Sequence, residues 1–125
     1  HHESIIINDS PDAVEQARKA AIACWGGEQL VQVDVAAERA DTLKRLASPA
    51  QWPDVILIVW RLCERWNGFA DDLSTHPGHG FFRLLAMVST SDEYGRVVLS
   101  GFGDAIVFEP VTADRLLESM LQVAI

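Results

Sequence analysis

The feature that most constrains the fold is an uninterrupted apolar run in the middle of the chain. Residues 55–60 read Val-Ile-Leu-Ile-Val-Trp and follow a Pro-Asp pair. A strand that is apolar on both faces must be buried on both faces, as the central strand of a parallel sheet is. The run is too short to span a membrane, which takes about 20 apolar residues. We therefore expect a central parallel strand with the other elements packed in layers around it.

Four further segments have the composition of strands. Residues 4–7 and 82–88 are almost continuously apolar, and 104–108 is a shorter apolar run. Residues 30–35 instead alternate, with three valines on one face. Alternation is typical of a strand with one exposed face, so we place 30–35 at an edge of the sheet.

Helical segments separate these strands. Ser10 and Pro11 suit the N-cap and first residue of a helix that the glycine pair at 26–27 ends. A second helix is expected over 38–47, and Thr112 can cap the last one.

The two segments that follow the central strands are weaker. We expect residues 61–67 to be irregular, with Cys63 in a loop, and 68–73 to form at most a short helix. The segment 92–100 is a poor helix by sequence, because Gly95 lies inside it.

Strands that alternate with helices indicate the α/β class. Parallel strands need crossover connections, and right-handed crossovers with helices on both faces give a doubly wound three-layer sandwich. A chain of 125 residues with 49% hydrophobic residues is long enough for one core. We assign residues 4–125 to a single domain and interpret residues 1–3 as a tag remnant or disordered start, because the chain opens on two histidines.

Charge and cysteine content exclude several classes of function. The formal net charge of −8 argues against binding to nucleic acid or to an anionic membrane, since few cations are available to neutralise phosphates. Cys24 and Cys63 do not form a CxxC motif, so a disulfide framework is not expected. No signal peptide is visible, and we expect a cytoplasmic protein.

Short motifs recur along the chain in a recognisable order. They are Asn8-Asp9 after the first strand, Pro53-Asp54 before the third, Asn67-Gly68-Phe69 downstream, Ser89 after the fourth and Glu109-Pro110 after the fifth. In this order and spacing the chain resembles the receiver domains of two-component response regulators, the CheY-like family, from about residue 5 to residue 122. The resemblance implies a flavodoxin-like five-stranded parallel sheet of order 2-1-3-4-5.

The same resemblance implies that the usual receiver activity is lost. Phosphoryl transfer needs a carboxylate nucleophile, a divalent cation held by carboxylates and a cation that balances the new charge. Val59 stands at the position of the phosphate-accepting Asp, Asn8 replaces half of the acidic pair, and Glu109 replaces the Lys. We therefore expect a pseudo-receiver with no catalytic residues and no cofactor, whose degenerate pocket contains Asn8, Asp9, Val59, Ser89 and Glu109.

Two pairs of residues are candidate metal sites. Asp9 and Glu109 could hold a cation, but hard cations prefer more oxygen ligands than these two carboxylates supply, so a hydrogen-bond network is favoured. His76 and His79 are three residues apart in a Pro-Gly loop with no further nitrogen or sulfur ligand nearby in sequence, which favours a solvated loop over a metal site. The Gly101-Phe102-Gly103 segment precedes a strand and indicates a turn rather than a nucleotide loop.

Aromatic residues cluster around the central strand. We expect Trp52 to pack at the far end of the sheet and Trp60 to be half-buried. Trp66, near Phe69, can be either a core anchor or part of an exposed binding patch, and the sequence does not decide between them.

The functional hypothesis is a non-phosphorylatable signalling domain of a bacterial regulatory system. It would act as a protein-interaction or dimerisation module that regulates an attached or partner output domain. The resemblance implies pairing through the fourth helix, fifth strand and fifth helix of the receiver fold, and the candidate contact residues are Trp66, Asp104, Ile106, Phe108 and Arg115. The alternative is a small-ligand sensor that uses the vacated pocket. An enzyme is not expected, because no nucleophile and base are paired in the sequence.

Overall fold

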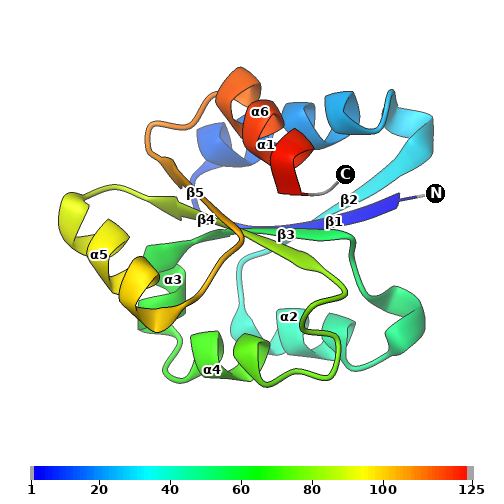
Figure 1. The fold of residues 1–125 in the computed structure, drawn as a ribbon. Coiled ribbons are helices and arrows are strands. Elements are labelled where there is room, and N and C mark those ends of the chain that lie inside the picture. Colours follow the sequence, from blue (N-terminus) through cyan, green and yellow to red (C-terminus); the bar gives the residue numbers. More distant parts are fainter. Residues whose placement is uncertain (1, 124–125) are drawn as a thin grey trace.

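A five-stranded parallel sheet forms the centre of the structure, a computed structural model that describes residues 2–123 (Figure 1). The strands are β1 (His2–Ile7), β2 (Val31–Ala36), β3 (Val55–Val59), β4 (Arg83–Val88) and β5 (Ala105–Phe108). The α-helices are α1 (Pro11–Cys24), α2 (Arg39–Leu46), α3 (Trp60–Arg65), α4 (Phe69–Ser74), α5 (Ser91–Ser100) and α6 (Ala113–Val123), and two 3₁₀ turns are η1 (Glu28–Leu30) and η2 (Pro49–Gln51). The strand order β2-β1-β3-β4-β5 confirms the predicted fold class.

Helices cover both faces of this sheet. Helices α1 and α6 lie side by side on one face, and α2, α3, α4 and α5 lie on the other (Figure 1). Small buried residues on α1, Ala13, Ala17, Ala20 and Ala21, allow the close approach of its neighbours. Between residues 2 and 123, no helix combines the length and the apolar character that crossing a bilayer demands.

The central strand β3 is buried as the apolar run predicted. All five of its residues are at most 1% exposed, and it pairs in parallel with β1 on one side and β4 on the other. Burying each such aliphatic side chain contributes about 1.5–3 kcal/mol to folding. Truncating Leu57, which pairs with both Ile6 and Leu85, would cost about 2–5 kcal/mol through the cavity it leaves.

The amino-terminal boundary of the domain was placed too late. His2 and Glu3 belong to β1 and pair with Val31 and Gln32 of β2, so neither residue is a disordered start. The backbone N–H of Glu3 donates to the carboxylate of Asp54 at 2.8 Å. Partners on both sides of the strand therefore hold this end of the chain in the sheet.

The expectation of an irregular segment after β3 was wrong. Val59 is both the last residue of β3 and the N-cap of α3, so the strand passes into the helix without a connecting loop. Trp60, Leu62 and Cys63 form the buried side of this short helix. Cys63 is thus not in a loop, and burial raises the pKa of its thiol to about 12. Tertiary burial of these apolar side chains stabilises a helix that local sequence alone did not indicate.

Helix α5 is also more regular than its sequence suggested. The helix has 10 residues in all, and Gly95 does not interrupt it. The Thr90 hydroxyl caps its first turn by accepting the Glu93 N–H at 3.1 Å, and Gly101 ends it in the left-handed conformation, with φ of 68°. Val97 is fully buried. Two caps and one buried anchor outweigh the propensity cost of a glycine, about 1 kcal/mol.

Candidate functional site

The residues predicted to form the degenerate pocket all lie at the carboxyl edge of the sheet. Asn8 and Asp9 follow β1, Val59 ends β3, Ser89 follows β4 and Glu109 follows β5. Parallel strands bring their carboxyl ends to one edge, which is where such folds bind ligands. The fold therefore places these five positions together, as the spacing of the motifs implied.

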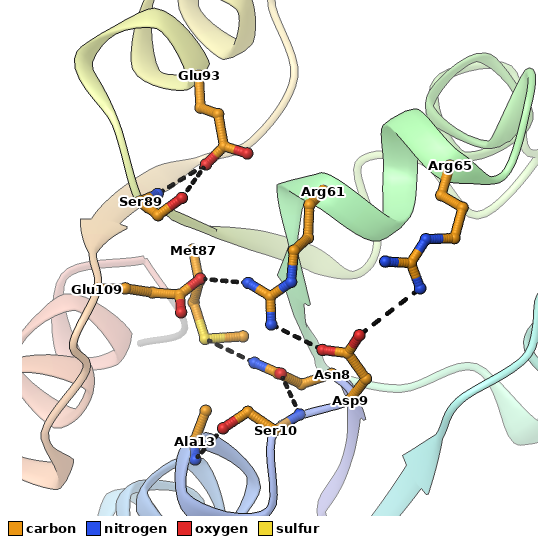
Figure 2. A network of polar contacts seen from close by, with 10 residues as sticks. All are labelled: Asn8, Asp9, Ser10, Ala13, Arg61, Arg65, Met87, Ser89, Glu93 and Glu109. Atoms are coloured by element: carbon orange, nitrogen blue, oxygen red, sulfur yellow. Dashed lines mark hydrogen bonds and ion pairs between the residues drawn. The ribbon is translucent and has the colours of Figure 1, made fainter.

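A guanidinium group occupies the centre of this edge. Arg61, in the first turn of α3, extends between Asp9 and Glu109 (Figure 2). Its Nη2 donates to Asp9 Oδ1 at 2.7 Å, and its Nη1 donates to Glu109 Oε1 at 2.9 Å. The two acidic residues that were considered as weak cation ligands are thus paired with a cation that belongs to the chain itself.

The electrostatics of the pocket follow from this bridge. The hydrogen bond from Arg61 lowers the pKa of Asp9 below its ordinary value, against the opposing effect of burial. Burial disfavours the charged form of Arg61, but its bonds to Asp9 and Glu109 outweigh that effect and raise its pKa. Arg65, one helical turn later, brings its Nη1 to 3.6 Å from the other oxygen of Asp9. Within the group of Asp9, Glu109, Arg61 and Arg65, two positive charges balance two negative charges.

The amide of Asn8 is used locally. Its Oδ1 accepts the backbone N–H of Ser10 at 2.9 Å, and its Nδ2 faces the sulfur of Met87 at 3.8 Å (Figure 2). The side chain is almost fully buried. Asn8 therefore holds the turn that leads into α1, where Ser10 accepts the N–H of Ala13 as the N-cap.

Ser89 is bound to a different acidic residue. Glu93, on α5, accepts both the backbone N–H of Ser89 at 2.7 Å and its hydroxyl at 2.8 Å through one carboxylate oxygen (Figure 2). Glu93 is 9% exposed. The Ser89 hydroxyl is consequently engaged with α5 instead of with Arg61 and its two carboxylates.

Val59 completes the pocket with an aliphatic side chain. It is 1% exposed and carries no atom that could accept a phosphoryl group. Between residues 2 and 123, no three His, Cys, Asp or Glu side chains lie close enough together to hold a metal ion. What the edge offers chemically is a closed set of ion pairs and hydrogen bonds beside a buried aliphatic strand end.

The two residues that organise this site, Arg61 and Glu93, were not predicted from the sequence. Arg61 directly follows the central strand, but an expected irregular segment gave its side chain no defined direction. Glu93 stands three residues after Thr90, the spacing of a helix capping box, which indicates a carboxylate that folds back over the helix start. The capping signal was available in the sequence, whereas the position of Arg61 depended on recognising α3.

Of the two loop histidines, His76 has structural contacts and His79 is exposed. His76 Nδ1 accepts the N–H of Gly78 at 2.8 Å, and its Nε2 contacts the carbonyl oxygen of Leu46 at 2.7 Å. The indole of Trp52 donates to the same carbonyl oxygen at 2.9 Å, so Trp52 packs at the amino edge of the sheet as expected. Gly103 is in a positive-φ conformation directly before β5, in the turn that was predicted there.

The remaining aromatic residues lie in and around α3. Trp60 is 5% exposed and packs on Phe102 with ring centroids 5.3 Å apart, so it is buried, not half-buried. Trp66 is half-buried, with its ring edge-to-face on that of the buried Phe69 at 5.1 Å. This packing favours the interpretation of Trp66 as an anchor of the α3–α4 connection.

The candidate partner residues do not all share one surface. Ile106, Phe108 and Arg115 line a groove of about 240 Å³ between β5 and α6. Asp104 instead accepts the N–H of Leu84 at 2.8 Å at the amino end of β5, and Trp66 lies at the end of α3. Three of the five residues thus define a surface, and the other two have structural partners elsewhere.

Comparison with known proteins adds a fold assignment to these observations. No protein-family model and no curated protein sequence matches the chain. Among solved structures, a response regulator from Thermotoga maritima matches with a TM-score of 0.75 at 10% identity, over 98% of this chain and 97% of its own. A CheY-like response regulator protein from Mesorhizobium loti matches with a TM-score of 0.61 at 16% identity, over 96% of each chain. The pilus assembly protein CpaE from Caulobacter crescentus matches with a TM-score of 0.66 at 12% identity, over 98% of this chain and 92% of its own.

The likeness to the two response regulators shows that this chain has the CheY-like receiver fold over nearly its whole length. At such low identities the likeness establishes the fold and not the activity. The function therefore has to be inferred from the residues at the carboxyl edge and on the surface of this chain.

Proposed function

We propose that the chain is a receiver-like signalling domain that is not phosphorylated and that acts through protein–protein contacts. The observation that carries this proposal is the Arg61 bridge beside a buried Val59. A receiver needs an acceptor carboxylate and room for a divalent cation. Here the acceptor position is aliphatic, and a guanidinium lies between the two carboxylates that remain. The proposed role is therefore non-catalytic.

The surface best suited to a protein partner is the one formed by α5, β5 and α6. Tyr94 and Val98 lie one turn apart on α5 and are 43% and 53% exposed. Tyr94 stacks on Phe108 of β5, with ring centroids 5.5 Å apart, and Phe108 is itself 40% exposed. Ile106 and Phe108 continue this surface into the groove beside α6. We call the set of Tyr94, Val98, Ile106 and Phe108 with Arg115 and Glu118 the docking face.

We propose that a second copy of the chain occupies the docking face. Arg115 and Glu118 both line the groove and lie three residues apart on α6. A two-fold axis between them would set each Arg115 opposite the partner's Glu118 while it joins the two aromatic stacks. Opposite charges around an apolar centre are the arrangement that a self-complementary interface requires. The pair would transmit a signal to an attached or separate output domain.

The absence of phosphorylation is tested with a small-molecule phosphodonor. Incubation with acetyl phosphate and magnesium should leave the mass of the protein unchanged. The triple variant Asn8→Asp, Val59→Asp, Glu109→Lys rebuilds the acidic pair, the acceptor and the lysine, and is the positive counterpart. Arg61 remains in that variant as a competing cation, so we expect weak incorporation. A phosphoryl group on the unmodified chain that maps to the carboxyl edge would refute the proposal.

The proposed pairing is tested by sedimentation equilibrium. The unmodified domain should dimerise reversibly, and Phe108→Ser should weaken the dimer about tenfold or more, because it removes the aromatic centre of the docking face. Phe81→Ser is the matched control, because Phe81 is also an exposed phenylalanine, at 62%, and lies in the loop before β4. Equal effects of the two variants would remove the docking face from the proposal.

A small-ligand sensor at the carboxyl edge is the weaker proposal. The polar groups of that pocket already have partners within the chain, so a ligand would have to displace the Arg61 bridge or the bond between Glu93 and Ser89. Screening metabolites for a rise in melting temperature would give this alternative its first support.

A further inference from the structure

Helix α5 supplies two residues of the docking face but is weakly embedded in the domain. Its contacts with other elements are mainly with β4 and α3. Glu93 and Val97 are its buried residues, while Tyr94 and Val98 face outward beside β5. The position of α5 therefore decides whether Tyr94 can stack on Phe108.

Helix α3 holds α5 at two points. The first is a two-bond ion pair in which Arg96 Nε and Nη2 donate to the two carboxylate oxygens of Glu64 at 2.6 and 2.9 Å. The hydrogen bond from Arg96 lowers the pKa of Glu64, so this carboxylate stays charged at neutral pH. The second is the packing of Trp60 on Phe102, which lies just beyond the end of α5. The ion pair holds the middle of α5, and the packing of Trp60 on Phe102 holds the segment just after its last residue.

Helix α3 is itself fixed at the carboxyl edge. It follows β3 without a loop, and Arg61 ties its first turn to Asp9 and Glu109. Because α3 is bonded to the carboxyl edge through Arg61 and to α5 through Glu64, the position of α3 relative to the sheet also sets the position of α5 in the docking face.

We propose that Glu64 and Arg96 are positioning residues for the docking face, with α3 as the strut between the sheet and α5. This inference rests on the proposed pairing for its biological meaning, but its structural content is independent. Breaking the ion pair loosens α5, changes the angle between Tyr94 and Phe108, and weakens association without touching the interface residues themselves.

The chain offers a closely matched control. Arg39 of α2 and Asp72 of α4 form another interhelical ion pair, with side chains 43% and 36% exposed. Arg96 and Glu64 are 49% and 36% exposed. Both are arginine–carboxylate pairs of similar exposure. They differ in that only the pair of Arg96 and Glu64 involves α5, and in that it has two hydrogen bonds where the pair of Arg39 and Asp72 has one.

Two measurements on full chains test the proposal. Hydrogen exchange of the amides in residues 94–99 should be about fivefold faster in Glu64→Gln than in the unmodified chain, with no change in Arg39→Gln. The dimer dissociation constant should rise about fivefold in Glu64→Gln and stay unchanged in Arg39→Gln. The exchanged pair Glu64→Arg with Arg96→Glu should restore both quantities toward those of the unmodified chain, which general destabilisation would not allow.

The outcomes separate this inference from the proposed function. Equal exchange in residues 94–99 of Glu64→Gln and Arg39→Gln would overturn the strut, whatever the oligomeric state. A monomeric unmodified chain in which Glu64→Gln still accelerates exchange in α5 would refute the proposed pairing and support the strut. Failure of the exchanged pair to restore slow exchange would assign the effect of Glu64→Gln to something other than the ion pair and would also overturn the strut.

Discussion

The carboxyl edge of the sheet and the docking face satisfy their side chains in opposite ways. At the edge, Asp9, Arg61 and Glu109 pair with one another, and Asn8 and Ser89 have partners within the chain. On the docking face, Tyr94 and Phe108 contact each other but leave much of their apolar surface exposed. The location where this fold usually binds ligands is closed by the chain's own groups, whereas the docking face beside it leaves apolar side chains exposed.

This contrast suggests how a receiver-like domain can keep its fold and change its input. At the closed edge, the side chains of Asp9, Arg61 and Glu109 already have partners within the chain. An apolar surface remains favourable to cover, because each square ångström removed from water contributes about 25 cal/mol. Substitutions at the edge should therefore change folding stability, and substitutions on the docking face should change association.

The largest effect is expected for Val59→Asp. Val59 is 1% exposed, so the substitution buries a carboxylate beside an aliphatic core. We expect a loss of about 3 kcal/mol in the free energy of unfolding at neutral pH, measured by urea denaturation, and no phosphorylation by acetyl phosphate. Val59→Thr matches the shape without the charge and should lose clearly less. Equal losses would mean that burying any polar group, and not specifically a charge, destabilises this position.

Removing the bridge itself should have the next largest effect. Arg61→Ala leaves Asp9 and Glu109 facing each other without their shared donor. The three side chains are 20–39% exposed, so solvent screening limits the loss to about 1–2 kcal/mol. Arg65→Ala removes only the 3.6 Å contact from a mostly exposed side chain and should cost less. Urea denaturation of both variants at low ionic strength measures the difference.

Arg61→Ala should also change how the free energy of unfolding depends on pH in the acid range. In the folded chain Arg61 lowers the pKa of Asp9 below its ordinary value of 3.8. A group with a lowered folded pKa contributes stability that is present above its unfolded pKa and is lost as pH falls through its folded pKa. The stability difference between the unmodified chain and Arg61→Ala should therefore narrow below pH 3.8. If the difference in the free energy of unfolding between the two chains stayed constant below pH 3.8, the pKa of Asp9 would not depend on Arg61.

A gain in stability of about 1 kcal/mol is expected for Gly95→Ala. Gly95 lies inside α5 with no positive φ, and a Cβ atom built there meets nothing within 4 Å. The alanine removes backbone freedom from the unfolded chain without a clash. Thermal denaturation measures the gain, and Gly101→Ala, at a φ of 68°, should lose stability instead. A neutral result for Gly95→Ala would indicate that α5 does not form cooperatively with the rest of the domain.

The smallest effect on stability is expected on the docking face. Phe108→Ser removes a ring that is 40% exposed in the monomer, so the free energy of unfolding should fall by less than about 1 kcal/mol when measured at concentrations where the chain is monomeric. A loss as large as that of Val59→Asp would show that the ring belongs to the core of the monomer. In that case the contrast between the two regions would not hold.

The sequence predicted the sheet better than it predicted the site. The apolar run of β3 indicated a strand buried on both faces, and the alternation in β2 indicated a strand at the edge of the sheet. The alternation did not predict burial of each valine, since Val35 is 51% exposed. The order of the strands came from the resemblance to receiver domains. The positions of Asn8, Asp9, Val59, Ser89 and Glu109 followed from the ends of those strands.

The contacts between these positions were not predictable in the same way. Arg61 bonds to Asp9, which is 52 positions away, and to Glu109, which is 48 positions away. This bridge exists because a six-residue helix starts at Trp60. Such a helix is too short to form alone and depends on burial of Trp60, Leu62 and Cys63. Local patterns therefore indicated which groups meet at the edge but not which of them pair.

The direct passage from β3 into α3 fixes the rotation of α3 about its axis relative to the strand. An α-helix turns by about 100° for each residue. One residue inserted or deleted between Val59 and Arg61 would rotate the guanidinium by that angle, away from Asp9 and Glu109. A connecting loop would have absorbed the change, and none is present at this junction. Single-residue changes of length should therefore be far less tolerated here than in a solvent-exposed connecting loop.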